Sequence, residues 1–181
     1  MARNFNFRDS EFQSYSMALG ELVLVWNDLH MTLASLFWTA SRIPNGLIAN
    51  AMWNSQSSDR AQRKLLDSII TLDVSGQIIR GKMQVELMWL LKEVEKIEEL
   101  RNNALHSPFF KDVNGNVFPW HQLGNKLAKK LAKKNPLTEF RWFYDTAIVL
   151  RDYAEVLGEA IHQTENQPLI RPRLPSRATT L

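Results

Sequence analysis

An unbroken three-four spacing of apolar residues in the first part of the chain constrains the fold more than any other feature. The residues that follow this spacing are Phe12, Tyr15, Leu19, Leu22, Trp26, Leu29, Leu33, Leu36 and Ala40. Such a stripe is typical of an amphipathic helix that buries one face. Asp9 or Ser10 can cap the first turn of this helix. The sequence therefore predicts one helix from about residue 10 to residue 41.

The same segment is apolar on more than one side. Its additional apolar residues are Val23, Val25, Met31 and Phe37. A helix of this kind either contacts both its own bundle and a second subunit, or is buried more deeply within the monomer. Both interpretations remain open from the sequence.

Further helices follow at regular intervals. The sequence predicts a short helix over 46–55, a helix from Ser57 or Ser58 to about 72, one over 77–106, and one from Pro136 to about 163. On the helix that ends near 72, Arg60, Arg63 and Lys64 are expected on the solvent side. The predicted fold is all-α: an up-and-down bundle of four long helices with one or two short additional helices.

One domain accounts for most of the chain. With 181 residues, the chain is long enough for a single bundle with a sizeable core, which we expect over residues 1–165. Residues 166–181 contain three prolines and three arginines without an apolar period, which predicts a flexible basic tail. Residues 109–122 form either a small hairpin around Asn114-Gly115 or an ordered loop.

An arginine follows the apolar stripe of the helix predicted over 77–106. The stripe consists of Met83, Leu87, Leu90, Val94 and Ile97, and its next position is Arg101. An arginine on a packing face is costly unless an anionic group meets it. Arg101 could therefore bind a phosphate, or pair with a carboxylate such as Glu21 on a neighbouring helix.

The end of this helix brings further polar groups. Pro108 disfavours helical geometry at Ser107, so the helix should end near His106. The negative end of the helix dipole favours a protonated histidine there. Asn102 and His106 share one face, whereas Arg101 and His106 point roughly 140° apart on an ideal helix. His106 could also simply cap the helix.

Arg101, Asn102 and His106 together resemble a known signature. An Arg, a polar residue directly after it and a His five positions after the Arg, at the end of a long helix, are similar to the motif of the HEPN superfamily. The resemblance covers residues 8–165. It implies a metal-independent ribonuclease in which a homodimer brings two motifs together, often within a toxin–antitoxin or other defence system. Other members are non-catalytic. One toxin branch has a Tyr two residues after the His, and Pro108 at that position argues against this branch.

A lysine-rich segment follows the motif. Residues 123–134 alternate Leu123, Leu127 and Leu131 with five lysines, which predicts a basic amphipathic helix. The lysines are Lys126, Lys129, Lys130, Lys133 and Lys134. Such a helix can bind nucleic-acid phosphates, which is the preferred interpretation. The alternatives are a solubilising face or a weak membrane-surface anchor.

Composition and motifs narrow the function classes. The chain has no cysteine, which excludes disulfides and thiolate metal sites. No signal peptide and no membrane-spanning run is visible, and we expect a cytoplasmic protein. Glu159 and His162 have the spacing of a di-metal bundle, but a second such pair is missing, so no metal is predicted. No phosphate-binding glycine loop is present, and we predict no cofactor.

The predicted function is a metal-independent endoribonuclease of HEPN type, which could be a toxin or defence component. In that role Arg101 stabilises phosphate charge, His106 transfers protons and Asn102 orients His106 or the phosphate. The predicted partners are RNA and a second copy of the chain, and an antitoxin or nucleotidyltransferase protein could be a further partner. The main alternative is a non-catalytic helical adaptor or nucleotide-binding subunit. A membrane-active toxin that uses the lysine helix is a third possibility.

Overall fold

A computed structural model of the chain describes residues 10–72, 81–107, 109–111, 117–119, 135–162 and 169–177. Its helices are α1 (Ser10–Ser41), α2 (Gly46–Asn54), α3 (Asp59–Leu72), α4 (Lys82–His106) and α6 (Pro136–His162). A short hairpin of β1 (Phe109–Lys111) and β2 (Val117–Pro119) lies between α4 and α6 in the sequence. The prediction of an all-α bundle is confirmed, and α1 has the predicted bounds.

Side-chain caps fix the starts of α2, α3 and α6. The Asn45 side chain accepts a hydrogen bond from Leu47 N–H at 2.9 Å. The Ser58 hydroxyl accepts one from Ala61 N–H at 3.2 Å, and the Asn135 side chain accepts one from Leu137 N–H at 3.0 Å. Each cap satisfies a backbone donor that the first helical turn leaves without a partner.

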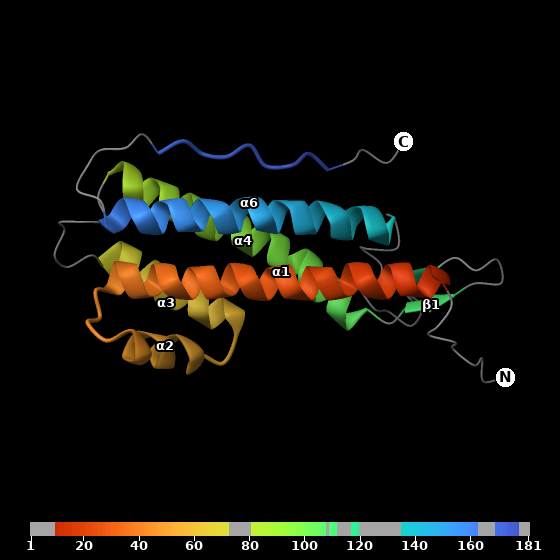
Figure 1. Ribbon diagram of the computed structural model, residues 1–181, viewed down its shortest axis with the longest axis horizontal. Coiled ribbons are helices and arrows are strands. Elements are labelled where there is room, and N and C mark those ends of the chain that lie inside the picture. The colour runs from red at the N-terminus through yellow and green to blue at the C-terminus, as the bar shows by residue number, and fades with distance from the viewer. Residues whose placement is uncertain are drawn as a thin grey trace.

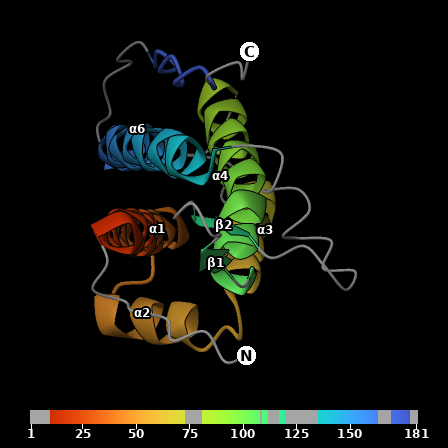
Figure 2. The same cartoon turned by 90° about the vertical axis from the view of Figure 1, so that its right-hand side faces the viewer.

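The helices form two layers. Figure 2 shows α6, α1 and α2 stacked in one layer, with α4 and α3 in the other. From α1 to α4 the chain reverses direction at each connection (Figure 1). Helices α1 and α6 run side by side in the same direction, since Tyr15 contacts Phe140 near their starts and Thr39 contacts His162 near their ends. This long contact is the framework on which α4 and α3 pack.

The core lies between the layers and is built from the predicted stripes. In α1 the most deeply buried residues are Leu22, Trp26, Leu29, Leu33 and Phe37. In α4 they include Leu87, Leu90, Val94 and Ile97, and in α6 Phe140, Phe143, Ala147, Leu150, Ala154 and Leu157. Val25 and Phe37, two of the additional apolar residues of α1, are buried within the monomer, whereas Met31 is exposed.

The hairpin alternative is the one found after α4. Strands β1 and β2 pair antiparallel, with Phe110 opposite Phe118. The Phe109 ring packs 4.4 Å, centroid to centroid, from Tyr15 in the first turns of α1. The hairpin therefore ties the end of α4 to the start of α1.

The expected flexible tail is wrong for residues 169–177, which we call the C-terminal strap. The strap runs in an extended conformation along α6 (Figure 1). Arg171 pairs with the buried Glu86 of α4. Trp142 Nε1 of α6 donates to the Pro175 carbonyl at 2.9 Å, and the Arg177 guanidinium lies 4.1 Å from the Trp142 ring centroid. A composition rich in proline and arginine predicted disorder, but guanidinium–tryptophan stacking and buried acids supply the missing contacts.

Candidate functional site

Arg101 lies on α4 where this helix meets α1 and α3. Its side chain is 24% exposed. One guanidinium nitrogen donates to Asn102 Oδ1 at 2.8 Å, and another lies 3.5 Å from Asp59 Oδ2. The anionic partner expected from the sequence is thus Asp59, at the first turn of α3, and not Glu21.

The apolar stripe of α4 does not stop at Arg101, which corrects the sequence-based interpretation. The stripe continues through Leu100 and Ala104, both buried. At about 100° per residue, Leu100 and Ala104 lie on the same side of Arg101, roughly 100° and 60° away around the helix axis. The buried face therefore shifts to that side in the last turns of α4, and Arg101 falls on its edge. Arg101 is therefore a half-buried cation beside the core.

Trp26 connects Arg101 to a second arginine. Trp26 Nε1 donates to Asp59 Oδ2 at 2.8 Å. The guanidinium groups of Arg101 and Arg63 lie 5.7 and 5.9 Å from the Trp26 ring centroid. Both distances are within cation–π range, so Trp26 holds two cations and one carboxylate in fixed relative positions.

Arg63 is buried, although the sequence predicted it on the solvent side of α3. Its guanidinium pairs with Glu98 of α4. It also lies 3.4 Å from His30 Nε2 of α1. An ionised group is buried at tolerable cost only when its charge and donors are matched, and here Glu98, His30 and Trp26 do so. The prediction failed because Glu98 is distant in sequence.

His30 is neutral in this cluster. An arginine cannot accept a hydrogen bond, so His30 Nε2 must be the acceptor from Arg63. His30 Nδ1 then carries the proton, and it lies 3.2 Å from Gln62 Oε1. Burial is the main reason that the pKa of His30 is lowered to about 4; the negative charge of Asp59 opposes this shift, and the positive charge of Arg63 adds to it. His30 thus serves as a fixed polar connector between α1 and α3.

His106 stands apart from these groups. It is the last residue of α4 and is exposed. Within the described parts of the chain, no hydrogen bond or ion pair joins His106 to Arg101 or Asn102. Asn102 is partly buried and accepts from Arg101. The structure therefore brings Arg101 and Asn102 together, while one copy leaves His106 open to a ligand from outside.

Two further polar side chains near His106 were missed from the sequence. Asn103 in the last turn of α4 and Ser107, the residue directly after the helix, are both buried. Asn103 Oδ1, Ser107 Oγ and Arg101 Nε are buried atoms without a hydrogen-bond partner among the described residues. The sequence offered one indication that Asn103 is buried: it lies beside Leu100 and Ala104 on the face of α4 that packs on the core.

The charges of the cluster balance. Arg63 and Arg101 carry two positive charges, and Asp59 and Glu98 carry two negative ones. These four groups alone provide no net attraction for an anion. Attraction of a polyanion would have to come from other basic groups, such as the predicted lysine helix. The five predicted RNA-binding lysines, Lys126, Lys129, Lys130, Lys133 and Lys134, lie outside the described residues.

The groove between α3 and α4 lies next to this cluster. It has a volume of about 270 Å³, and Arg60, Arg63, Lys64, Lys92, Asp67 and Glu95 are among its lining residues.

Within the described ranges, no group of three or more histidine and acidic side chains could hold a metal ion. Among those residues no helix has the length and apolarity to cross a bilayer.

Comparison with protein-family models, with curated proteins and with solved structures finds no match.

Proposed function

We propose that the chain is a metal-independent endoribonuclease of HEPN type. The proposal is supported by the position of Arg101, Asn102 and His106, which occupy the last turns of a long helix in an all-α bundle. Arg101 is held in one orientation by Asp59, Asn102 and Trp26. A cation fixed in advance stabilises a developing negative charge better than a mobile one, because it needs no reorganisation during the reaction.

One observation carries the proposal. Five buried side-chain atoms of the described residues lack a hydrogen-bond partner, and three of them belong to residues 101–107. A buried polar atom without a partner costs about 1–3 kcal/mol, so native proteins keep few of them. Their concentration in residues 101–107 supports a functional role for this turn, because native proteins keep such atoms mainly where a site requires them.

The proposed chemistry uses the nucleophile that RNA itself carries. The 2′-OH attacks the adjacent phosphorus, a base removes its proton, and the bond from phosphorus to the 5′-oxygen breaks as that oxygen takes up a proton. His106 transfers protons, Arg101 stabilises the charge on the phosphorane oxygens, and Asn102 orients the Arg101 guanidinium. The products are a 2′,3′-cyclic phosphate and a 5′-hydroxyl.

A second candidate function is a non-catalytic adaptor or nucleotide-binding subunit. The observation that favours it is the ion pair of Arg101 with Asp59, which gives Arg101 a structural role without any ligand. In that case Arg101 supports the junction of α1, α3 and α4, and His106 is only an exposed residue at a helix end.

The test uses three variants and total RNA in EDTA. We expect His106→Ala and Arg101→Ala each to reduce cleavage by about 10²-fold or more. His162→Ala is the matched control, because His162 is also an exposed histidine in the last turn of a helix. End-group analysis of the cut RNA checks the chemistry. Absence of cleavage by the wild type, or 5′-phosphate ends, would reject the proposal, and unfolding of Arg101→Ala would favour the adaptor.

Completion of the site by a second copy is a further part of the proposal. The resemblance implies it, and the separation of Arg101 from His106 within one copy supports it. Mixing Arg101→Ala with His106→Ala subunits tests it, because a mixed pair retains one intact combination of Arg101 and His106. Recovery of cleavage supports a composite site, whereas an inactive mixture under conditions of subunit exchange refutes it.

A further inference from the structure

Helix α1 has an exposed apolar stripe on the side opposite the core. Met17, Leu24, Met31 and Trp38 recur every seven residues, and they are 66%, 70%, 72% and 48% exposed. We call these four residues the α1 outer stripe. A seven-residue apolar repeat keeps one line of side chains facing a partner helix over several turns. Scattered exposed apolar residues need no explanation, but this regular line does.

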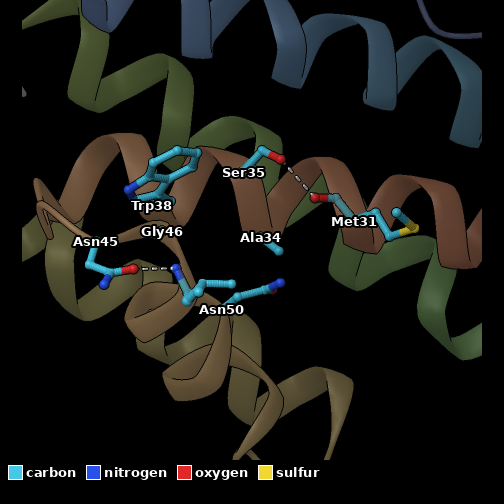
Figure 3. A pocket seen from close by; sticks show the side chains of 8 residues that line it. Met31, Ala34, Ser35, Trp38, Asn45, Gly46 and Asn50 are labelled. Atoms are coloured by element: carbon cyan, nitrogen blue, oxygen red, sulfur yellow. Dashed lines mark hydrogen bonds between the residues drawn. The ribbon is translucent and has the colours of Figure 1, made fainter.

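The groove beside the stripe is preformed. Figure 3 shows Met31 and Trp38 of α1 opposite α2, with Ala34, Gly46 and Asn50 around a pocket of about 500 Å³. Trp38 Nε1 donates to the Ile43 carbonyl at 2.9 Å. A Cβ on Gly46 would lie 2.9 Å from the Trp38 ring, so glycine is what allows α2 to start this close to the indole. The pocket is therefore shaped by fixed groups and can receive an apolar side chain.

We infer that the α1 outer stripe binds the same stripe of a second copy, with the two α1 helices antiparallel. In this register Leu24 lies opposite Met31 of the second copy, and Met17 lies opposite Trp38. The end of the stripe that carries Trp38 and lies beside α2 then meets the end of the other copy that carries Met17. A parallel arrangement would bring the two α2 helices against each other and place Glu21 beside Glu21 of the second copy, which like charges disfavour.

The polar residues near the centre of the stripe fit this register. Asn27 and Asp28 are both exposed and lie next to the twofold axis. The Asn27 amide can donate to Asp28 of the second copy, and one polar pair of this kind fixes the register of a helix pair. Arg151 of α6 lies 2.7 Å from Asp28 and matches its charge, so the two Asp28 carboxylates do not meet as bare charges.

The available area fits a stable pair. The outer stripe and the neighbouring Leu47, itself 79% exposed, offer on the order of 600 Å² of apolar surface per copy. An interface also contains polar surface in a usual proportion, so its total area would be about 1,000 Å² per copy. A standard interface needs about 800 Å² per partner. A second copy is therefore a sufficient occupant for this face.

This contact is separate from the candidate site. Since a helix advances about 100° per residue, Trp26 lies about 140–160° around α1 from Leu24 and Met31, and His30 lies about 100–120° from them. Both residues, which contact the two arginines, therefore face away from the stripe. Pairing through the outer stripe thus leaves both Arg101–His106 regions facing away from the interface. If a composite site also forms, the chain has two different copy-to-copy contacts and assembles beyond a dimer.

The test is the molar mass of full-length variants in solution at micromolar concentration. We expect Leu24→Glu/Met31→Glu to have half the mass of the wild type, with the same helical circular-dichroism signal and a cooperative unfolding transition. Val85→Glu is the control, because Val85 is 55% exposed on α4 in the other layer, and it should keep the wild-type mass. Any cleavage by the wild type should persist in the stripe variant.

Two results would overturn the inference. One is a wild type that is monomeric at these concentrations, or a stripe variant of unchanged mass. The other concerns the register and uses the absence of native cysteines. A mixture of Leu24→Cys and Met31→Cys chains should form mixed disulfides on oxidation. If two Leu24→Cys chains crosslink with each other in preference, the pair is parallel and the proposed register is wrong. The mass readout does not depend on whether the chain cleaves RNA.

Discussion

Acidification should destabilise the protein through His30, and the geometry of its contacts sets the size of the effect. His30 accepts from Arg63 through Nε2 and lies beside Gln62 through Nδ1, an arrangement that only the neutral ring satisfies. A proton on Nε2 would point at the Arg63 guanidinium. The informative substitution is His30→Gln, because the glutamine side chain can still accept from Arg63 but does not titrate in this range.

The magnitude follows from the pKa of His30 in the two states. That pKa is about 4 in the folded protein, below its ordinary value of 6.5. Between these values the unfolded chain binds more protons, so the free energy of unfolding falls as the pH drops from 6.5 towards 4. The loss attributable to His30 should be about 2 kcal/mol at pH 5 and about 3 kcal/mol near pH 4. Against a typical total of ~5–15 kcal/mol, this is a measurable fraction.

The assay compares urea unfolding of the wild type and His30→Gln at pH 7.5, 6 and 5, followed by tryptophan fluorescence. Taking the difference between the two proteins removes the contribution of carboxylates common to both. We expect the wild type to lose more stability than the variant by the amounts above. Parallel pH profiles would refute the reasoning, as would a ring-proton NMR titration that places the pKa of His30 near 6.5.

Two further predictions concern the lysine segment and the strap. If the lysines track an RNA backbone, replacing them with Gln should weaken RNA binding and reduce the slope of log affinity against log salt, by about 0.7–0.9 for each phosphate that is no longer neutralised. The set to replace is Lys126, Lys129, Lys130, Lys133 and Lys134. An unchanged slope would assign that segment to a solvated face. Arg171→Ala should lower the free energy of unfolding by about 1–3 kcal/mol, since it leaves the buried Glu86 without its cation. Arg173→Ala, on the same strap but without an ion pair to the described residues, should have little effect. Equal melting temperatures for these two variants would contradict the structural role of the strap.

Most helix boundaries were readable from local patterns, although α4 begins at Lys82 and not near residue 77. The stripe of α1 and the cap at Ser58 depend on neighbours within a few residues, and the structure confirms them. Local rules of this kind specify which face is buried and where a helix begins.

The candidate site was readable only in part, because its contacts are distant in sequence. Arg63 was expected on a solvent face, yet Glu98 and His30 from two other helices make its burial tolerable. Asp59 as the partner of Arg101 depends on how α3 packs against α4, which no spacing within either helix reveals. The strap was misjudged for the same reason, since Glu86 and Trp142 belong to other elements.

The strap behaves as a peptide ligand that the chain carries with it. Its extended, proline-containing backbone lies between Glu86 and Trp142, with one arginine on Trp89 and another on Trp142. Aromatic rings and acids are also how separate receptor domains recognise proline-rich peptides. Because the strap is joined to α6 through residues 163–168, its local concentration beside Glu86 and Trp142 is of millimolar order or higher, so even weak intrinsic affinity keeps it bound. A chain that ends at residue 162 would then expose a ready-made receptor, and a synthetic peptide of residues 169–177 would restore its stability in a concentration-dependent way. The protein could in this sense be divided into two pieces and reassembled.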